Sequence, residues 1–405
     1  MNRRQWMVLG GGSASAVWLS GCAGVPAAAS VDPCHTRAKG TGDLGVVVLR
    51  ASGELAVVDT SARTVLGRIA GLGDLSHASL VFSRDGASAF VFGRDGALTK
   101  VNLLTHTIET RVMQAGNSIG GSISQDGRLV VAQNYTPGGI KVFDANTLET
   151  LADVPAIFDG DRRSRVVGLR DLPRQRFIFS LFDGDETWVA DLSVPRQPQI
   201  TRLKQIGRQP YDALITPDGR HYIAGLFGED GLAMIDLWEE PLRVRRILPG
   251  YGRGEQPLPV FKMPHLRGWA VAGRQAWLPA IGRHEVLVVD TESWAEVGRV
   301  TVAGQPVFVI ARPDGRQVWV NFALPHHHRM EVIDVPSRRV VRGLEPGRAV
   351  MHMEFTPRGE SVWVSSRDDN RVAVIDTNTF ETQATLALPA PSGIFFTSRA
   401  ARLGF

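Results

Sequence analysis

The chain is poor in cysteine, with only Cys22 and Cys34 among its 405 residues. Two thiols cannot build the disulfide framework of a small secreted domain, and the absence of a Cys-x-x-Cys-His motif excludes covalent attachment of a c-type haem. If Cys22 is acylated, no disulfide can form within the mature chain. If Cys22 is not acylated, the two cysteines could form a bridge in an oxidising compartment.

The chain also lacks an excess of charge and the motifs of common enzymes. Its 45 Lys and Arg residues nearly balance its 41 Asp and Glu residues, and no basic block stands out. Aromatic and basic residues do not alternate, so no nucleic-acid partner is expected. The mature chain has no Gly-x-Ser-x-Gly, His-Glu-x-x-His, P-loop or dinucleotide motif, so no nucleotide cofactor is expected and a conventional hydrolase has no motif support.

Residues 1–21 have the composition of a signal peptide. Arg3 and Arg4 precede an apolar stretch that is too short and too rich in Gly and Ser to span a membrane stably. The following LSGC (19–22) resembles a bacterial lipobox, which predicts cleavage before Cys22 and lipidation of its thiol. The mature protein is therefore expected in the periplasm, attached to a membrane by its lipid.

Two further features bear on export and on anchoring. The stretch RRQW (3–6) resembles a twin-arginine signal in which Trp replaces the usual Phe. Ala23 and Gly24 do not resemble an inner-membrane retention signal, which favours the outer membrane. Residues 22–42 are rich in Ala, Pro, Gly and Ser and are interpreted as a flexible tether.

A repeat organises the rest of the chain. An apolar strand that ends in Asp or Asn recurs eight times at spacings of 42 to 54 residues, with the polar residue at Asp59, Asn102, Asp144, Asp191, Asp236, Asp290, Asp334 and Asp376. This period, with short strands and no helical pattern, predicts an all-β, eight-bladed β-propeller with four antiparallel strands per blade. We interpret the recurring Asp as structural, because Asp caps turns through its own backbone.

The ends of the repeat predict how the ring closes. The second unit fits four strands, A to D, at 77–83, 88–94, 97–104 and 107–113. The first unit begins at 45–50, which matches strand B, while a spare strand at 393–399 follows the complete last unit. This spare C-terminal strand is expected to join the first blade and to close a single domain over residues 43–405.

Propeller topology brings the D–A and B–C connections together on one face, around the central channel. The residues predicted near D–A junctions are His77, Tyr211, His265, Arg348 and His352, and those predicted near B–C connections are Arg50, Arg94, Tyr135, Asp183, Glu229, Asp230, His284, His326, His327, His328 and Arg367. Such a basic mouth suits a planar polyanionic ligand, because Arg pairs with carboxylates and His can bind a metal. We interpret the His triplet as a solvated loop, because adjacent side chains diverge. His352 could face the channel or pack between blades.

Several stretches together resemble the NirF family of haem d1 biosynthesis proteins. They are LRASGELAVVD (49–59), SRDGASAFVFGRDG (83–96), IAGLFGEDGLAMIDLW (223–238), GYGRGEQPLPVFKMPHLRGW (250–269), FTPRGESVWVSSRDDNRVAVIDT (355–377) and PSGIFFTSRA (391–400). The resemblance spans essentially the whole mature chain. It extends to the eight-bladed d1 domain of cytochrome cd1 nitrite reductase.

The resemblance implies roles for individual residues. GDLSHASL (73–80) matches the segment of the reductase that carries the axial ligand of the haem iron, which places His77 on that ligand. Arg50, Arg94 and Tyr135 match positions in its B–C turns, and His265 matches a distal active-site histidine. The reductase has a second distal histidine on its seventh blade, and Arg312 or Pro313 takes that place here. Protonation of nitrite by a histidine pair is then not available.

The leading hypothesis is that the protein binds a d1-type haem, or its precursor, without reducing nitrite. Its carboxylates would pair with some of the arginines Arg50, Arg94, Arg348 and Arg367. It would carry out a late oxidation or side-chain conversion, with His265 or Tyr135 as acid or base, before the product reaches other haem d1 biosynthesis proteins and cytochrome cd1 nitrite reductase. One alternative is a non-catalytic carrier of the tetrapyrrole, and another is a propeller scaffold for protein partners.

Overall fold

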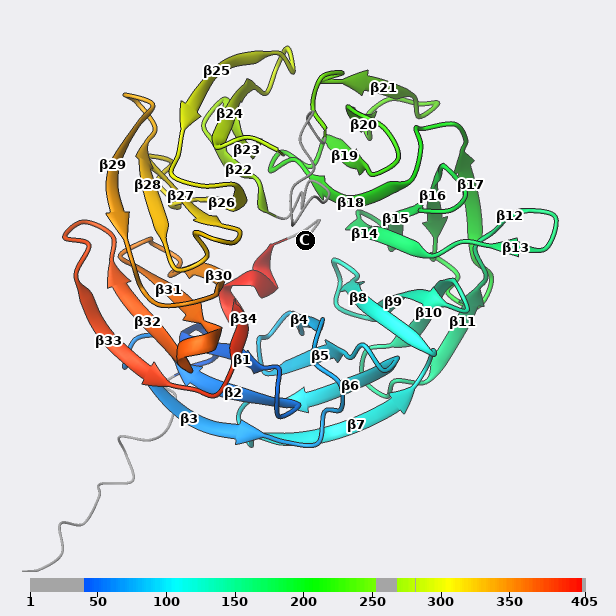
Figure 1. The fold of residues 1–405 in the computed structure, drawn as a ribbon. Coiled ribbons are helices and arrows are strands. Elements are labelled where there is room, and N and C mark those ends of the chain that lie inside the picture. The colour runs from blue at the N-terminus through cyan, green and yellow to red at the C-terminus, as the bar shows by residue number, and fades with distance from the viewer. Residues whose placement is uncertain (1–39, 253–267, 281, 403–405) are drawn as a thin grey trace, which may run out of the picture. The chain divides into compact units, whose positions relative to one another are not determined.

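Eight four-stranded antiparallel sheets form a ring around a central axis in the computed structural model, which describes residues 40–252, 268–280 and 282–402 (Figure 1). Each sheet is one blade of a β-propeller, and its four strands follow one another from the centre of the ring to the rim. The predicted all-β propeller with four strands per blade is confirmed.

The first four blades are given from the innermost to the outermost strand. Blade 1 contains β34 (Pro391–Phe396), β1 (Leu44–Leu49), β2 (Glu54–Asp59) and β3 (Thr64–Ile69). Blade 2 contains β4 (Ser79–Phe82), β5 (Ser88–Phe92), β6 (Ala97–Asn102) and β7 (Thr107–Met113). Blade 3 contains β8 (Asn117–Ile123), β9 (Leu129–Thr136), β10 (Gly139–Asp144) and β11 (Thr150–Val154). Blade 4 contains β14 (Val166–Leu172), β15 (Arg176–Leu181), β16 (Glu186–Asp191) and β17 (Gln199–Leu203).

The remaining blades follow the same order. Blade 5 contains β18 (Pro210–Ile215), β19 (His221–Leu226), β20 (Leu232–Asp236) and β21 (Val244–Ile247). Blade 6 contains β22 (Ala270–Ala272), β23 (Gln275–Pro279), β24 (Glu285–Asp290) and β25 (Glu296–Thr301). Blade 7 contains β26 (Pro306–Ala311), β27 (Gln317–Phe322), β28 (Met330–Asp334) and β29 (Arg339–Leu344). Blade 8 contains β30 (Val350–Phe355), β31 (Ser361–Ser366), β32 (Arg371–Asp376) and β33 (Thr382–Ala387).

Short elements complete the described fold. The hairpin of β12 (Ile157–Asp159) and β13 (Arg162–Arg163) is inserted between blades 3 and 4, and the 3-10 helices are η2 (Thr41–Asp43), η4 (Arg367–Asp369) and η5 (Thr397–Ala401). No described helix is long and apolar enough to cross a membrane. Because the strands of a blade alternate in direction, all B–C and D–A connections lie on one face, which we call the mouth. The A–B and C–D turns lie on the opposite, far face.

The turns on the far face explain the sequence repeat. The side chain of Asp59 accepts hydrogen bonds from the backbone N–H groups of Ser61 and Ala62, at 2.9 and 2.7 Å. The other seven repeat residues cap their own C–D turns in the same way. The predicted structural role of these residues is therefore confirmed. The A–B turns use glycine with positive φ, for example 68° at Gly86, where a side chain would strain the backbone.

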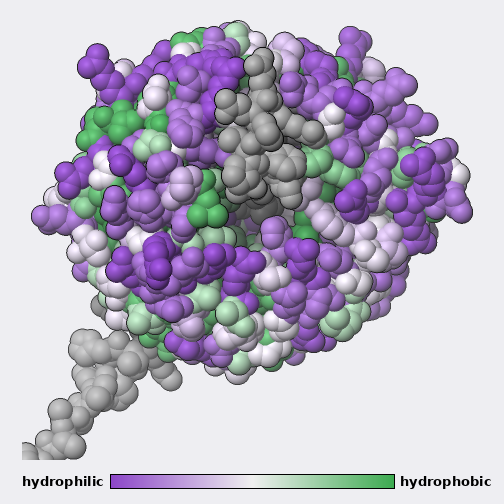
Figure 2. Space-filling model, in the orientation of Figure 1, coloured by the Kyte–Doolittle hydropathy of each residue, from purple (hydrophilic) through white to green (hydrophobic). Residues whose placement is uncertain are grey.

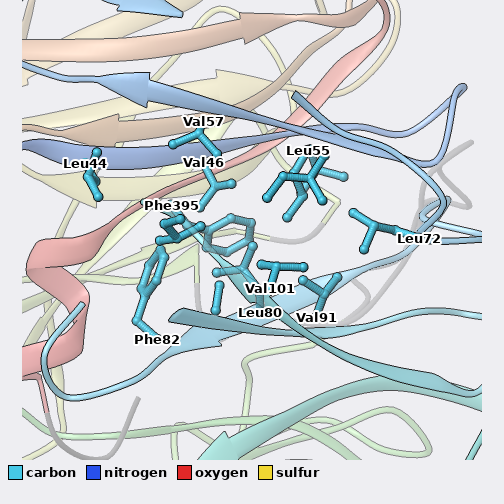
Figure 3. Packing of buried hydrophobic residues seen from close by; sticks show 14 of the residues in the cluster. Leu44, Val46, Leu55, Val57, Leu72, Leu80, Phe82, Val91, Val101 and Phe395 are labelled. Carbon is cyan, nitrogen blue, oxygen red and sulfur yellow. The ribbon is translucent and has the colours of Figure 1, made fainter. Parts of the chain in front are cut away.

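The hydrophobic core lies between the faces of neighbouring blades. All six residues of β1 and all six of β31 are buried, because these sheets pack against a blade on either side. Figure 3 shows the layer where Val46 and Val57 of blade 1 meet Leu80 and Phe82 of blade 2. Burial of each such side chain stabilises the fold by about 1.5 to 3 kcal/mol. Hydrophilic side chains predominate on the face seen in Figure 2, as expected when the apolar ones lie between the blades.

The last strand closes the ring as the sequence predicts. β34 pairs antiparallel with β1, with Phe396 opposite Gly45 and Phe395 opposite Val46. The following helix η5 lies on the far face, where the Thr397 hydroxyl contacts the carbonyl oxygens of Thr41 and Leu44 at 2.5 and 2.8 Å. The two ends of the described chain are thus joined in one blade.

Candidate functional site

The loop 70–78 carries His77 onto the mouth face and is fixed against blades 1 and 2. The Leu72 N–H donates to the Gly53 carbonyl oxygen at 3.1 Å. Gly73 has a φ of 78°, which strains other residues, and a Cβ atom there would lie 2.2 Å from the Asp95 carboxylate, which would have to move. Blades 1 and 2 therefore hold the backbone that leads to His77 from both sides.

The apolar residues of this loop are buried and anchor it, while its His77 is exposed. Leu72 and Leu75 are each 1% exposed and belong to the core between blades 1 and 2. The Ala78 N–H donates to the Leu75 carbonyl oxygen at 3.3 Å, which forms a turn just before β4. His77 lies within this turn and is exposed. An imidazole in this position is accessible to a ligand at the mouth.

Arg50 and Arg94 flank the same loop. The backbone N–H of Arg94 donates to the backbone carbonyl oxygen of Asp74 at 2.9 Å. The pKa of the Asp74 carboxyl is lowered, chiefly by hydrogen bonds from Ser76 and further by the positive charges of Arg94 and Arg50. In the described part of the chain, neither guanidinium has a carboxylate within 4.0 Å. Both arginines thus keep their hydrogen-bonding capacity for an incoming anion.

Arg348 and Arg367, which the sequence also assigned to the ligand, are already paired. Arg348 Nε donates to Asp369 at 2.8 Å, and Arg367 Nε donates to Asp368 at 2.7 Å. The pKa of the Asp368 carboxyl is lowered, chiefly by its hydrogen bond from Arg367. A ligand carboxylate would have to share these guanidiniums with aspartates of the B–C connection of blade 8.

Two tyrosines from different blades meet at the mouth. Tyr135 lies near the end of β9 in blade 3, and Tyr211 lies near the start of β18 in blade 5. The Tyr135 hydroxyl donates to the Tyr211 hydroxyl oxygen at 2.9 Å. Burial is the largest cause that raises the pKa of both phenols, so both stay protonated at neutral pH.

An aromatic cluster, made of Tyr211, Phe182 and Phe227, adjoins this pair. The ring centroids of Phe182 and Tyr211 are 5.9 Å apart in an edge-to-face arrangement, and those of Phe182 and Phe227 are 5.8 Å apart. The Arg165 guanidinium lies over the Phe182 ring, 4.2 Å from its centroid. Arg165 is held there by Asp183, with hydrogen bonds of 2.6 and 3.0 Å.

The mouth therefore has two unlike sides. Arg50 and Arg367 directly follow strand B in blades 1 and 8, whereas Phe182 and Phe227 occupy the corresponding position in blades 4 and 5. The basic side and the aromatic side thus face each other across the ring. The sequence analysis did not identify the two phenylalanines, nor Arg165. Both phenylalanines directly follow strand B of their blades, and this position in the repeat could have identified them from the sequence.

The histidine triplet 326–328 lies in the B–C connection of blade 7, as predicted, and is half-buried. The rings of His326 and His284 approach edge-to-face with centroids 6.2 Å apart. The His327 carbonyl oxygen accepts the Val350 N–H at 2.8 Å. Among the described residues, no group of three or more His, Cys, Asp or Glu side chains is arranged to hold a metal ion.

His352 packs between blades, which was one of its two predicted positions. Its ring centroid lies 5.6 Å from that of Phe395 and 6.3 Å from that of Phe308. Its Nδ1 accepts the Ile394 N–H at 3.3 Å. Burial lowers the pKa of His352 to about 4, so the imidazole is neutral at physiological pH.

Arg312 and Pro313 require a correction. They lie in the turn between β26 and β27, on the far face, where Arg312 pairs with Asp314 and contacts Asn378 at 2.9 Å. This turn is at the opposite end of the blade from the mouth. The prediction that one of these residues takes the place of a second distal histidine is therefore wrong.

A pocket of about 490 Å³ lies on the far face, between blades 5 and 6. Four of its charged lining groups form two ion pairs. Arg220 pairs with Asp236 at 2.6 Å, and Arg274 pairs with Glu292. The mouth is the stronger candidate site because it combines Arg50 and Arg94, which have no such partners in the described chain, with an aromatic cluster. His265 and Cys22 lie outside the described residues.

Comparison with known proteins shows the family of the chain. The family model of the Cytochrome D1 heme domain matches residues 39–400, so the chain is a propeller of the cytochrome d1 haem domain class. A protein named Protein NirF from Stutzerimonas stutzeri is 60% identical over 368 residues, which are 90% of this chain and 94% of that protein. Protein NirF from Pseudomonas aeruginosa is 56% identical over the same shares. The chain belongs to the NirF family.

A solved structure supports the fold. The protein described as "Dihydro-heme d1 dehydrogenase NirN in complex with DHE" aligns with a TM-score of 0.78 and 24% identity, over 89% of this chain and 77% of that chain. The dihydro-heme d1 dehydrogenase of Pseudomonas aeruginosa is also similar in sequence, at 27% identity over 78% of this chain and 64% of that protein.

Proposed function

We propose that this protein binds a d1-type tetrapyrrole, or its precursor, at the mouth of the propeller and acts late in haem d1 biosynthesis. The observation that carries the proposal is the two-sided mouth, because a tetrapyrrole combines an aromatic ring with acidic side chains. Arg50 and Arg94 would pair with its carboxylates. The aromatic cluster would contact its ring. The names of the relatives, which refer to haem d1 and to its dihydro form, support this ligand class.

His77 is proposed as the axial ligand of the iron. Its loop is held by buried Leu72 and Leu75 and by the close approach of Gly53 and Gly73, so the imidazole starts from a fixed backbone. A neutral imidazole is a common ligand of haem iron. Arg348 and Arg367 are proposed as secondary contacts, because Asp369 and Asp368 compete for them.

The proposed activity is a late modification of the macrocycle, an oxidation or a side-chain conversion, that serves the maturation of cytochrome cd1 nitrite reductase. His265 or Tyr135 is the proposed acid or base group of this activity. A non-catalytic carrier that passes the tetrapyrrole to the next protein of the pathway is the second candidate. The state of Tyr135 favours the carrier. Its phenol stays protonated, which makes it a poor base, and its O–H is already hydrogen-bonded to Tyr211, which makes it a poor acid toward the ligand.

Incubation of the pure protein with dihydro-haem d1 separates these functions. Absorbance would be followed during titration, and the mass of the extracted tetrapyrrole would be measured afterwards. A shifted spectrum with a changed mass supports the enzyme, and a shifted spectrum with an unchanged mass supports the carrier. Absence of any spectral change at micromolar concentrations contradicts the proposed function in both forms.

Location is part of the same proposal. The N-terminal sequence supports a periplasmic protein anchored through lipidated Cys22, on the outer membrane in preference to the inner one. Its proposed partners are other haem d1 biosynthesis proteins and cytochrome cd1 nitrite reductase.

A further inference from the structure

The hydrogen bond between the two mouth tyrosines has a direction. A tyrosine hydroxyl has one proton to donate and can accept hydrogen bonds as well. Tyr135 donates its proton to the Tyr211 oxygen at 2.9 Å. Among the residues that the structure describes, the Tyr211 hydroxyl has no acceptor for its own proton. The pair therefore presents one available donor at the mouth, and that donor belongs to Tyr211.

We propose that Tyr211 donates a hydrogen bond to a peripheral oxygen of the bound tetrapyrrole, and that Tyr135 is a positioning residue that acts through Tyr211. This inference rests on the proposed function and adds a specificity-determining contact to it. The ligand oxygen would be a carbonyl or carboxylate oxygen at the edge of the macrocycle, since both accept such a bond. Tyr211 would therefore favour tetrapyrroles that carry a carbonyl or carboxylate oxygen at the edge of the macrocycle that lies beside it.

The surroundings of Tyr211 hold its ring in place. Its ring packs edge-to-face with the ring of Phe182, which also contacts Phe227 and the Arg165 guanidinium. Arg165 in turn is fixed by two hydrogen bonds to Asp183. The Tyr211 ring in β18 is thus packed against a group of residues from three different connections. A hydroxyl on such a ring loses little conformational entropy when it binds a ligand.

The charges around Tyr211 keep its hydroxyl a donor. Burial is the first cause that raises its pKa, and the negative charge of Asp212 raises it further. The hydrogen bond from Tyr135 and the positive charges of Arg165 and Arg94 act in the opposite direction without reversing the shift. The phenol therefore stays protonated at neutral pH and can donate a hydrogen bond.

The test is a double-mutant cycle that uses dihydro-haem d1 as the probe. Affinity and the position of the main absorption band would be measured by titration of wild type, Y135F, Y211F and the double variant. Y211F is expected to weaken binding about 5- to 10-fold, as for loss of one hydrogen bond, and to shift the absorption band. Y135F is expected to weaken binding about 2- to 3-fold, and its effect should vanish when Tyr211 is already Phe.

Tyr222→Phe is the matched control. Its hydroxyl donates to the Gly168 carbonyl oxygen at 2.9 Å inside the blades, so this change affects stability and leaves the mouth intact. Wild-type affinity and spectrum in Y211F would overturn the inference, as would an effect of Y135F that persists at full size in the Y211F background. Failure of the wild type to bind the probe would instead overturn the proposed function.

Discussion

Arg399 of η5 and Glu354 of β30 form an ion pair that is largely excluded from solvent. Arg399 Nε lies 2.6 Å from Glu354 Oε1, and the two side chains are 14% and 8% exposed. The pair joins the last helix to the innermost strand of blade 8. Arg84 of blade 2 holds the same helix from the other side, through a hydrogen bond of 2.8 Å to the Ala400 carbonyl oxygen.

Arg399→Leu is expected to lower the free energy of unfolding by about 3 kcal/mol, because the Glu354 carboxylate is left buried without its main partner. Denaturant titration measures this change. Arg358→Leu is the control, since Arg358 is 89% exposed in its pair with Glu360 and surface pairs contribute little. Equal losses in the two variants would contradict the role of burial.

Arg50→Ala and Arg94→Ala are each expected to weaken binding of dihydro-haem d1 by about tenfold, because a charge-assisted hydrogen bond contributes more than a neutral one. Arg348→Ala and Arg367→Ala should weaken it less, since Asp369 and Asp368 already pair with these side chains. Absorbance titration of the four variants gives the ranking. The reverse order would place the ligand carboxylates beside blade 8.

His77→Ala is expected to abolish the absorption features of axial imidazole ligation in the protein incubated with dihydro-haem d1. His106→Ala is the control, because His106 lies in the C–D turn of blade 2 on the far face. Ultraviolet and visible spectra of both variants measure the difference. An unchanged spectrum in His77→Ala would remove this residue from the iron and would favour a propeller scaffold for protein partners.

The half-buried His352 predicts a pH dependence of stability. Its pKa is about 4 in the folded chain, against an ordinary value of 6.5. The unfolded chain therefore binds the proton more tightly, and stability present above pH 6.5 is lost as the pH falls toward 4. The loss from this residue amounts to about 3 kcal/mol. Unfolding free energies of wild type and His352→Gln at pH 7 and pH 4.5 should show a smaller decrease in the variant; parallel decreases would contradict the assignment.

Cys22→Ala is expected to move the protein from the membrane fraction to the soluble fraction of the periplasm, because the lipidated thiol is the proposed anchor. Cell fractionation followed by immunoblotting detects the change. Cys34→Ala is the matched control and should remain with the membrane. Membrane association of the Cys22→Ala protein at wild-type levels would exclude lipid anchoring at this residue.

The sequence was sufficient for the architecture because the features that build a blade are local. Asp59 and its seven counterparts cap turns two or three residues away, and Gly86 forms a turn within five residues. The contact of β34 with β1 was also predictable, since one unit lacked a strand that another had in excess.

The site was only partly predictable because its contacts cross between blades. The sequence placed Arg50, Arg94 and His77 near one another. It could not show that Arg348 and Arg367 form ion pairs with aspartates in the B–C connection of blade 8. The hydrogen bond from Tyr135 to Tyr211 joins residues 76 positions apart in two blades that are not neighbours. The error at Arg312 has another origin, because the resemblance was matched by blade, whereas Arg312 lies in the local turn between β26 and β27, away from the mouth.

The pairing of β34 with β1 also sets an order of events for the newly made chain. Blade 1 lacks its innermost strand until residues 391–396 have been synthesised. The ring of blades therefore cannot close before this segment is available. Bringing together segments about 345 residues apart is entropically costly and slow. Arg50, which follows β1, therefore joins the mouth residues of blade 8 only after residues 391–396 have been made, although Arg94 of blade 2 precedes them by about 300 residues.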